Sequence, residues 1–250
     1  MSAGRSFVAV SRAVGALALL VVLFPCGAPA GSAGAQVADG PPVVKITAPR
    51  NGSTHAWNSL VNYHIVVSYR GKSTQYQELP ASDVLLQAAY VPDLSALAGK
   101  PPSAASAPPA GLLDITNSNC LGCHDFKAKA MAPSFAAIAA RYPDTPATIG
   151  LLSQRIRIGS TGVWGEDSMP SHPDLTDNQL HDIVLWILKD AANRDVTYYV
   201  GTDGAIRMQA TGTPVRRAGM ILTASYTAPS TAIAQGQAAR GEDVVILRGK

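Results

Sequence analysis

Charged residues are scarce in this chain of 250 residues: Asp, Glu, Lys and Arg make up 15%, against 47% for apolar residues. Such a composition excludes a disordered chain and is sufficient for at least one buried core. Aromatic residues contribute only 6%, and three cysteines exclude a disulfide-rich scaffold. The net charge of +3 is too small and too dispersed for a nucleic-acid-binding surface. We therefore expect one or two folded domains that bind no nucleic acid.

The N-terminal residues 1–35 have the order of a secretory signal peptide. Two arginines are followed by an apolar run at 13–24, which is too short to span a bilayer comfortably. Small residues come next, so we place cleavage after Ala35, with cleavage after Ala30 as an alternative. The other interpretations are an uncleaved anchor and a lipoprotein attached at Cys26. We predict a periplasmic or secreted protein with no stable membrane span after cleavage.

The remaining sequence reads as a helical segment between two β-rich segments. Residues 36–93 and 193–250 carry short β-branched runs separated by turn residues, and residues 94–110 have the Pro/Ala/Ser-rich composition of a linker. Residues 111–192 change to helical periodicity. Three strands before this segment and four after it make seven, the complement of an Ig-like sandwich. We expect an α+β multidomain fold: an all-α module inserted into one sandwich, with two separate β units as the alternative.

Periodicity and turn residues also give the expected bounds of each element. The predicted strands cover residues 43–47, 60–69, 84–90, 197–200, 205–209, 220–226 and 244–247. The predicted helices cover residues 111–119, 134–142, 147–158 and 176–192. The last helix has the clearest signal, because Thr176 and Gln179 make a capping box in front of an amphipathic stripe.

One motif carries chemistry: Cys120-Leu121-Gly122-Cys123-His124, a C-x-x-C-H sequence. Two thiols three residues apart on one turn can each add to a vinyl group of haem, and the histidine that follows is placed to bind the iron. Attachment by this route takes place outside the cytoplasm, in agreement with the predicted export. Because the motif occurs once, we predict one covalently bound haem c.

Three other interpretations of the two cysteines stay open on these grounds. A zinc site would need His172 and His181, which lie about fifty residues further on with a spacing unusual for zinc ligands. A thioredoxin-like redox pair should follow a strand in a βαβ unit, whereas this motif follows a predicted helix. The third interpretation is a structural disulfide between Cys120 and Cys123.

Haem iron takes a second axial ligand, and Met169 is the leading candidate. It lies in a loop before the last helix, from which its sulfur can reach the far face of the haem. Met131 lies only seven residues after His124, too close to cross to the other face. His172, three residues beyond Met169, is the rival ligand.

Taken together, these motifs make positions 111–192 similar to the class I monohaem cytochromes c of bacterial electron transport. The resemblance is carried by the stretches Asn119–His124, Ala132–Phe135, Gln154–Ile156, Gly159–Gly165 and Met169-Pro170, and by the final helix with Trp186. It implies that Cys120 and Cys123 form thioethers and that His124 and Met169 bind the iron.

The same resemblance implies roles for three residues around the ligands. The carbonyl of Pro133 would accept the ring N–H of His124 and fix its orientation. Arg155 and Trp164 would bind a haem propionate. One position departs from the family, since an Asn often found three residues after the axial Met is His172 here.

The flanking segments resemble β-sandwich stretches around cytochrome c modules in secreted sugar dehydrogenases that use pyrroloquinoline quinone. The resemblance implies an electron-transfer protein that accepts single electrons from a dehydrogenase and passes them towards a respiratory oxidase. The resemblance also implies that this protein is not itself an enzyme, although it can be the cytochrome subunit of a dehydrogenase complex. The alternative is a haem-containing binding module or sensor whose sandwich recognises carbohydrate or a protein partner.

Overall fold

The computed structural model describes residues 40–97, 108–228 and 239–250. The predicted signal peptide and most of the predicted linker lie outside these ranges, so the structure does not test them. Within the described ranges, no helix has the length and apolar character needed to cross a membrane.

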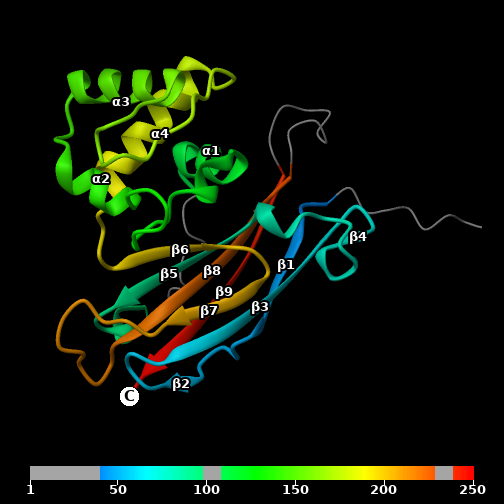
Figure 1. The fold of residues 1–250 in the computed structure, drawn as a ribbon. Coiled ribbons are helices and arrows are strands. Elements are labelled where there is room, and N and C mark those ends of the chain that lie inside the picture. The colour runs from blue at the N-terminus through cyan, green and yellow to red at the C-terminus, as the bar shows by residue number, and fades with distance from the viewer. Residues whose placement is uncertain (1–39, 98–107, 229–238) are drawn as a thin grey trace, which may run out of the picture. The chain divides into compact units, whose positions relative to one another are not determined.

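The described strands form two sheets (Figure 1). The strands are β1 (Val43–Ala48), β2 (Thr54–His55), β3 (Leu60–Tyr69), β4 (Lys72–Ser73), β5 (Val84–Val91), β6 (Val196–Val200), β7 (Asp203–Arg207), β8 (Gly219–Thr227) and β9 (Arg240–Gly249). One sheet has the order β1-β3-β4, with β7 also paired to β3, and the other has the order β2-β9-β8-β5-β6. Every pairing is antiparallel except that of β2 with β9.

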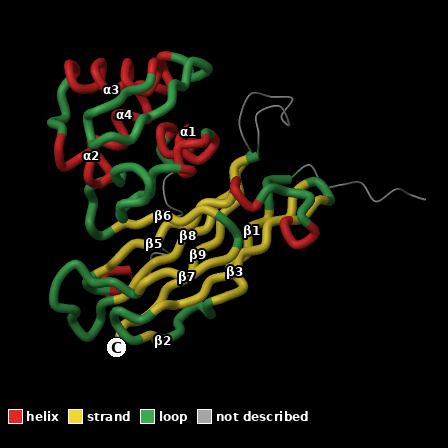
Figure 2. Tube along the Cα trace, viewed as in Figure 1, coloured by secondary structure: helices red, strands yellow, loops and turns green. Residues whose placement is uncertain are grey.

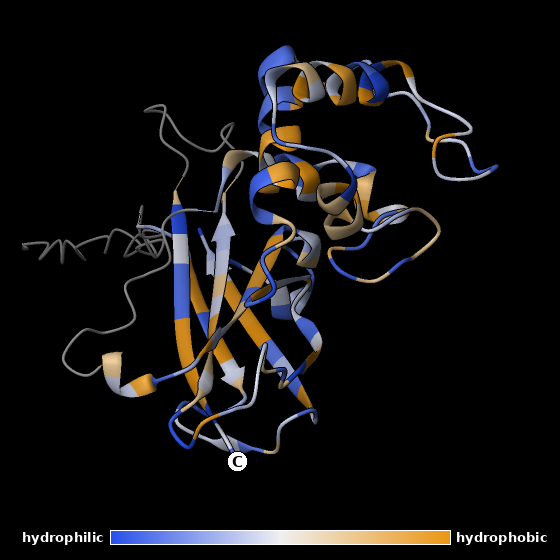
Figure 3. Cartoon of the chain, turned by 90° about the vertical axis from the view of Figure 1, so that its left-hand side faces the viewer, coloured by the Kyte–Doolittle hydropathy of each residue, from blue (hydrophilic) through white to orange (hydrophobic). Residues whose placement is uncertain are grey.

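The two sheets share one apolar core. Alternate residues of β3 are buried, which is the period of two expected for a strand with one covered face. Ile65 of β3, Leu86 of β5 and Leu222 of β8 are all fully buried in a single cluster that draws on both sheets. Figure 3 shows apolar and polar residues following one another along the strands. The inward faces of the two sheets are therefore packed against each other.

Strands from before and after the helical segment pair with one another. β5 lies between β8 and β6, with Leu85 opposite Val200 and Ala89 opposite Val196. In the other sheet β3 pairs with β7. The chain thus leaves one sheet after β5 and returns to it at the neighbouring strand, with about a hundred residues in between.

In the described part of this stretch, the chain forms four α-helices and connecting loops, which Figure 2 draws in red and green. The helices are α1 (Ala110–Asn117), α2 (Phe135–Arg141), α3 (Pro146–Ile158) and α4 (Asp177–Asp190). The Thr176 hydroxyl accepts from the Gln179 N–H and the Gln179 side chain reaches back to Thr176, so the predicted capping box at the start of α4 is present. α3 begins after Thr145, whose hydroxyl accepts from the N–H of Thr148.

Helices α1 and α4 cross at a glycine. A Cβ added to Gly111 would lie 1.9 Å from the carbonyl oxygen of Asp182, so no larger residue fits there without moving a helix. The contact buries Leu112 and Ile115 of α1 in the same cluster as Ile183 of α4. The crossing brings the start and the end of the helical segment together, as its connection to neighbouring strands requires.

Several element bounds differ from the sequence-based predictions. The described residues contain nine strands, so the predicted number of seven is wrong. The two additional strands, β2 and β4, have only two residues each and are too short to show periodicity in the sequence. β9 begins at Arg240, four residues earlier than predicted, because its polar start pairs with β8. Residues Leu94–Leu97 of the predicted linker form a 3₁₀-helix, and the N–H of Leu94 donates to the carbonyl of Arg217. The first part of the linker is thus hydrogen-bonded to the loop that precedes β8.

The helix crossing yields a prediction with a matched control. Gly111→Ala should destabilise the protein by about 1–3 kcal/mol, because the added methyl group overlaps the backbone of α4. Gly150→Ala places the same methyl group in open space on α3 and should stabilise the helix by roughly 0.5–1 kcal/mol. Denaturant unfolding measures both changes. Equal effects of the two substitutions would contradict the close crossing.

Candidate functional site

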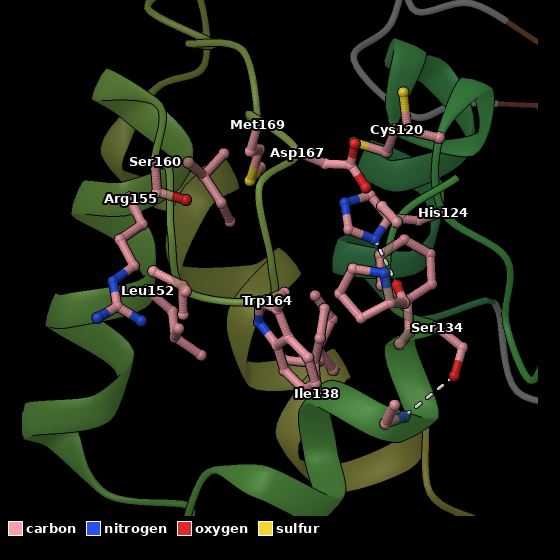
Figure 4. A pocket seen from close by; sticks show the side chains of 18 of the residues that line it. Cys120, His124, Ser134, Ile138, Leu152, Arg155, Ser160, Trp164, Asp167 and Met169 are labelled. Carbon is pink, nitrogen blue, oxygen red and sulfur yellow. Dashed lines mark hydrogen bonds between the residues drawn. The ribbon is translucent and has the colours of Figure 1, made fainter. Parts of the chain in front are cut away.

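A cavity of about 390 Å³ lies among the helices and their connecting loops, within the range of roughly 300–1,000 Å³ that small-molecule and cofactor sites occupy. All seven residues that the sequence analysis singled out line it: Cys120, Cys123, His124, Pro133, Arg155, Trp164 and Met169. In Figure 4, His124, Trp164 and Met169 border one space from different segments, and Arg155 lies on the helix at its side. The structure therefore brings together residues that are up to 49 positions apart in the sequence.

The two cysteines lie on a tight turn at one wall of the cavity. Residues Asn119–Gly122 form a 3₁₀-helix, and the N–H groups of Cys123 and His124 both donate to the carbonyl of Cys120, at 3.2 and 3.0 Å. No disulfide joins Cys120 to Cys123, so the sulfurs of both residues are available to a cofactor. In the described ranges, no three His, Cys, Asp or Glu side chains lie close enough together to hold a metal ion.

The geometry of His124 fixes which ring nitrogen is available to a ligand. Its Nδ1 lies 2.6 Å from the carbonyl oxygen of Pro133 (Figure 4). A carbonyl can only accept a hydrogen bond, so Nδ1 is the donor and Nε2 is the ring nitrogen that remains available to a ligand. The imidazole also stacks on Phe135, with ring centroids 5.3 Å apart and planes 18° apart. His124 is thus oriented by one hydrogen bond and one ring contact.

Met169 is held by the backbone of the loop that follows α3. Its N–H donates to the carbonyl of Ser160 at 2.8 Å, and its carbonyl accepts from the N–H of Ser160 at 3.1 Å. Gly159 makes this pairing possible, because its φ is +81° and an added Cβ would lie 2.8 Å from the Met169 carbonyl oxygen. The N–H of His172 donates to the carbonyl of Ile156, which closes the loop onto α3. The position of Met169 is therefore set by the end of α3.

Two arginines, Arg141 and Arg155, contact the aromatic rings of Tyr142 and Trp164 at one side of the cavity. Arg155 donates from Nη1 to the hydroxyl of Tyr142 at 2.8 Å. Arg141 places its guanidinium 4.4 Å from the centroid of the Trp164 ring and donates to the carbonyl of Val163. Sequence reasoning missed Arg141 and Tyr142, although a cation next to an aromatic residue at the end of α2 was a visible signal.

Met131 and His172, the other thioether and imidazole considered as iron ligands, also line the cavity. His172 pairs its Nε2 with the side-chain oxygen of Asn119 at 2.9 Å, which links the Met169 loop to the cysteine turn. The other ring nitrogen of His172 is buried without a hydrogen-bond partner in the described ranges. Met131 is 68% exposed, and its sulfur lies 3.9 Å from that of Cys123. Met131 thus belongs to the cysteine side of the cavity, as its place in the sequence indicated.

The donor set fits a haem c. Two adjacent thiols, one imidazole with a free nitrogen and one thioether surround a space whose other walls are largely aliphatic. Those walls include Ile138, Leu152, Ile156, Val184 and Ile187. Apolar walls suit the porphyrin ring, and the arginine side of the cavity suits its carboxylates.

Comparisons with known proteins identify the segment that carries this cavity. The family model described as "Cytochrome c" matches residues 114–191. Cytochrome c-552 of Hydrogenobacter thermophilus is 35% identical over 86 residues, which cover 31% of this chain and 87% of that protein. The chain belongs to the cytochrome c family. As a member, it contains one covalently bound haem c and is a monohaem electron carrier.

Other cytochromes show the same extent of similarity. Cytochrome c-551 of Pseudomonas aeruginosa is 32% identical over 72 residues, or 29% of this chain and 68% of that protein. The crystal structure of Nitrosomonas europaea cytochrome c552 is 33% identical, covers 30% of this chain and 94% of that one, and has a TM-score of 0.30. Each of these similarities covers about a third of the chain.

Covalent attachment gives the first prediction for the cytochrome site. Replacing Cys120 and Cys123 together by Ser should abolish haem staining on a denaturing gel, because no thioether can form. Cys26→Ser, at the third cysteine of the chain, should leave the staining intact. Staining that persists in the double variant would contradict attachment at this turn.

Proposed function

We propose that this cytochrome is a periplasmic or secreted carrier that accepts single electrons from a dehydrogenase and passes them towards a respiratory oxidase. The observation that carries the proposal is that His124 and Met169 line one cavity while each is held by its own backbone segment. Two fixed protein ligands leave iron no open position for a substrate. This arrangement favours electron transfer over a haem enzyme or a gas sensor.

The proposed roles follow the chemistry of each side chain. Cys120 and Cys123 would form the thioethers with the haem, and His124 and Met169 would bind its iron. The bound haem supplies one iron that changes between the ferric and ferrous states. Because the ligands are anchored before and after the electron arrives, little reorganisation accompanies the change of charge.

The groups around the ligands adjust the electronic properties and the orientation of the cofactor. The Pro133 carbonyl accepts the Nδ1 proton of His124, which fixes the ring and makes the imidazole a stronger electron donor. Arg155 uses one nitrogen on Tyr142 and keeps further N–H groups for a haem propionate. Trp164 is the second propionate donor, and the guanidinium of Arg141 across its ring holds the indole in place.

We further propose that the two sheets form an Ig-like sandwich into which the cytochrome is inserted. The pairing of β5 with β6 and of β3 with β7, across the helical segment, supports one sandwich over two separate β units. The sandwich would hold the haem edge towards a protein partner. Export by cleavage of residues 1–35 would place the protein where haem attachment to C-x-x-C-H occurs.

A reduction assay tests the proposed donor. Mixing the oxidised holoprotein with a quinoprotein sugar dehydrogenase and its sugar should reduce the haem, which is followed by visible absorption in a stopped-flow instrument. Omitting the sugar is the control and should leave the haem oxidised. If the dehydrogenase turns over with an artificial acceptor but leaves this haem oxidised, the proposed donor class is wrong.

The sixth ligand is tested by three variants of residues that line the same cavity. Met169→Ala should remove the weak near-infrared band of a Met sulfur on ferric haem and lower the reduction potential, because a thioether favours the ferrous state. Met131→Ala, the matched control, should keep both properties, since its sulfur lies on the cysteine side. If the wild-type protein lacks the band, and His172→Ala changes the reduction potential while Met169→Ala does not, the ligand is His172.

A further inference from the structure

Successive residues of strand β6 pack into two different cores. Tyr199 lies against the core between the sheets and contacts the ring of Tyr63, with centroids 6.1 Å apart. Tyr198 and Val200 pack instead into the core of the helical segment, together with Leu85 of β5. The outer face of the sheet that contains β5 and β6 therefore forms one wall of the core of the helical segment. Both β5 and β6 lie outside residues 114–191, the segment that the cytochrome c family model matches.

A continuous chain of ring contacts runs from that wall to the proposed haem ligand. The ring centroid of Tyr198 lies 5.8 Å from that of Trp186 and 5.6 Å from that of Phe126. Both of these rings contact Phe135, at 6.0 and 5.9 Å. Phe135 in turn stacks on the imidazole of His124. Burial raises the pKa of the Tyr198 phenol, so the wall carries no charge at neutral pH.

Backbone hydrogen bonds at Phe126 and Phe135 close the loop that orients His124. The N–H of Phe135 donates to the carbonyl of Asp125 at 3.0 Å, and the N–H of Ala136 donates to that of Phe126 at 3.2 Å. These bonds close the loop that contains Pro133, whose carbonyl accepts the His124 proton. A displacement of Phe126 or Phe135 would therefore move both partners of the Nδ1 hydrogen bond.

A polar link runs parallel to the ring contacts. Lys127 lies in the same loop, and its ammonium donates to the carbonyls of Ala191 and Asn193 at 2.7 and 2.5 Å. These carbonyls follow α4 and precede β6 in the chain. The loop of His124 is thus joined to the start of β6 by two independent sets of contacts.

We propose that Tyr198 is a positioning residue of the haem site, through which strand β6 holds the wall behind His124 and keeps water away from it. This inference rests on the proposed role of His124 as an iron ligand. Water that enters behind the ligand stabilises the more highly charged ferric state, so loss of the Tyr198 ring lowers the reduction potential.

Two neighbouring tyrosines give the test its matched control. In the full-length holoprotein, Tyr198→Ala should lower the ferrous-to-ferric ratio at a fixed ambient potential by a factor of roughly 3 to 10. This is smaller than the roughly 10–100-fold loss of metal affinity or activity that follows removal of a group hydrogen-bonded to a metal ligand, because Tyr198 reaches His124 only through other rings. Tyr199→Ala removes the same side chain from the other face and should leave the ratio unchanged while lowering the unfolding midpoint. Tyr198→Phe removes only the hydroxyl group and keeps the ring, so it should keep the wild-type ratio.

The outcomes separate this inference from the proposed function. Equal shifts for Tyr198→Ala and Tyr199→Ala, or an unchanged ratio in Tyr198→Ala, would overturn the role of Tyr198. If Tyr198→Ala does not accumulate as holoprotein, Tyr198→Leu keeps most of the bulk and should still lower the ratio; a wild-type ratio in that variant would also overturn it. A wild-type protein that has no haem, or whose haem does not require His124, would contradict the proposed function instead.

Discussion

The antiparallel pairing of β5 with β6 is the constraint on which the rest of the structure depends. Leu85 lies opposite Val200 and Ala89 opposite Val196, yet the helices occupy the sequence between these strands. The helical segment between them must therefore begin and end at nearly the same place. The close crossing of α1 and α4 at Gly111 meets this requirement, because it brings the first and last helices of the segment into contact.

This pairing also makes β5 a strand with two covered faces. Val84, Leu86 and Ala88 belong to the core between the sheets, whereas Leu85 belongs to the core that contains α1 and α4. A strand buried on both sides reads as a continuous apolar run, as residues 84–86 do. The helices and the sheet thus share side chains, and the segment 111–192 does not hold the whole of its own core.

The parts of the fold with local signals could be predicted from the sequence. The bounds of β3 match the predicted strand, since its alternation over ten residues is unbroken, and α4 begins at its predicted capping box. The C-x-x-C-H motif located the cavity, because both thiols and the histidine sit on one turn. What sequence reasoning missed depends on long-range contacts. Nothing near Tyr198 in the sequence indicates that it meets Trp186 and Phe126, and Arg141 stacks on Trp164 only after α2 and the Met169 loop have come together.

A spectroelectrochemical titration of the full-length holoprotein, with and without carbon monoxide, tests whether one haem is held between His124 and Met169 and carries one electron at a time. We expect a single one-electron transition that carbon monoxide leaves in place, because His124 and Met169 would together leave the iron no open position. A transition that carbon monoxide shifts strongly would show an open or readily displaced ligand position, and the absence of a haem transition would contradict the account altogether.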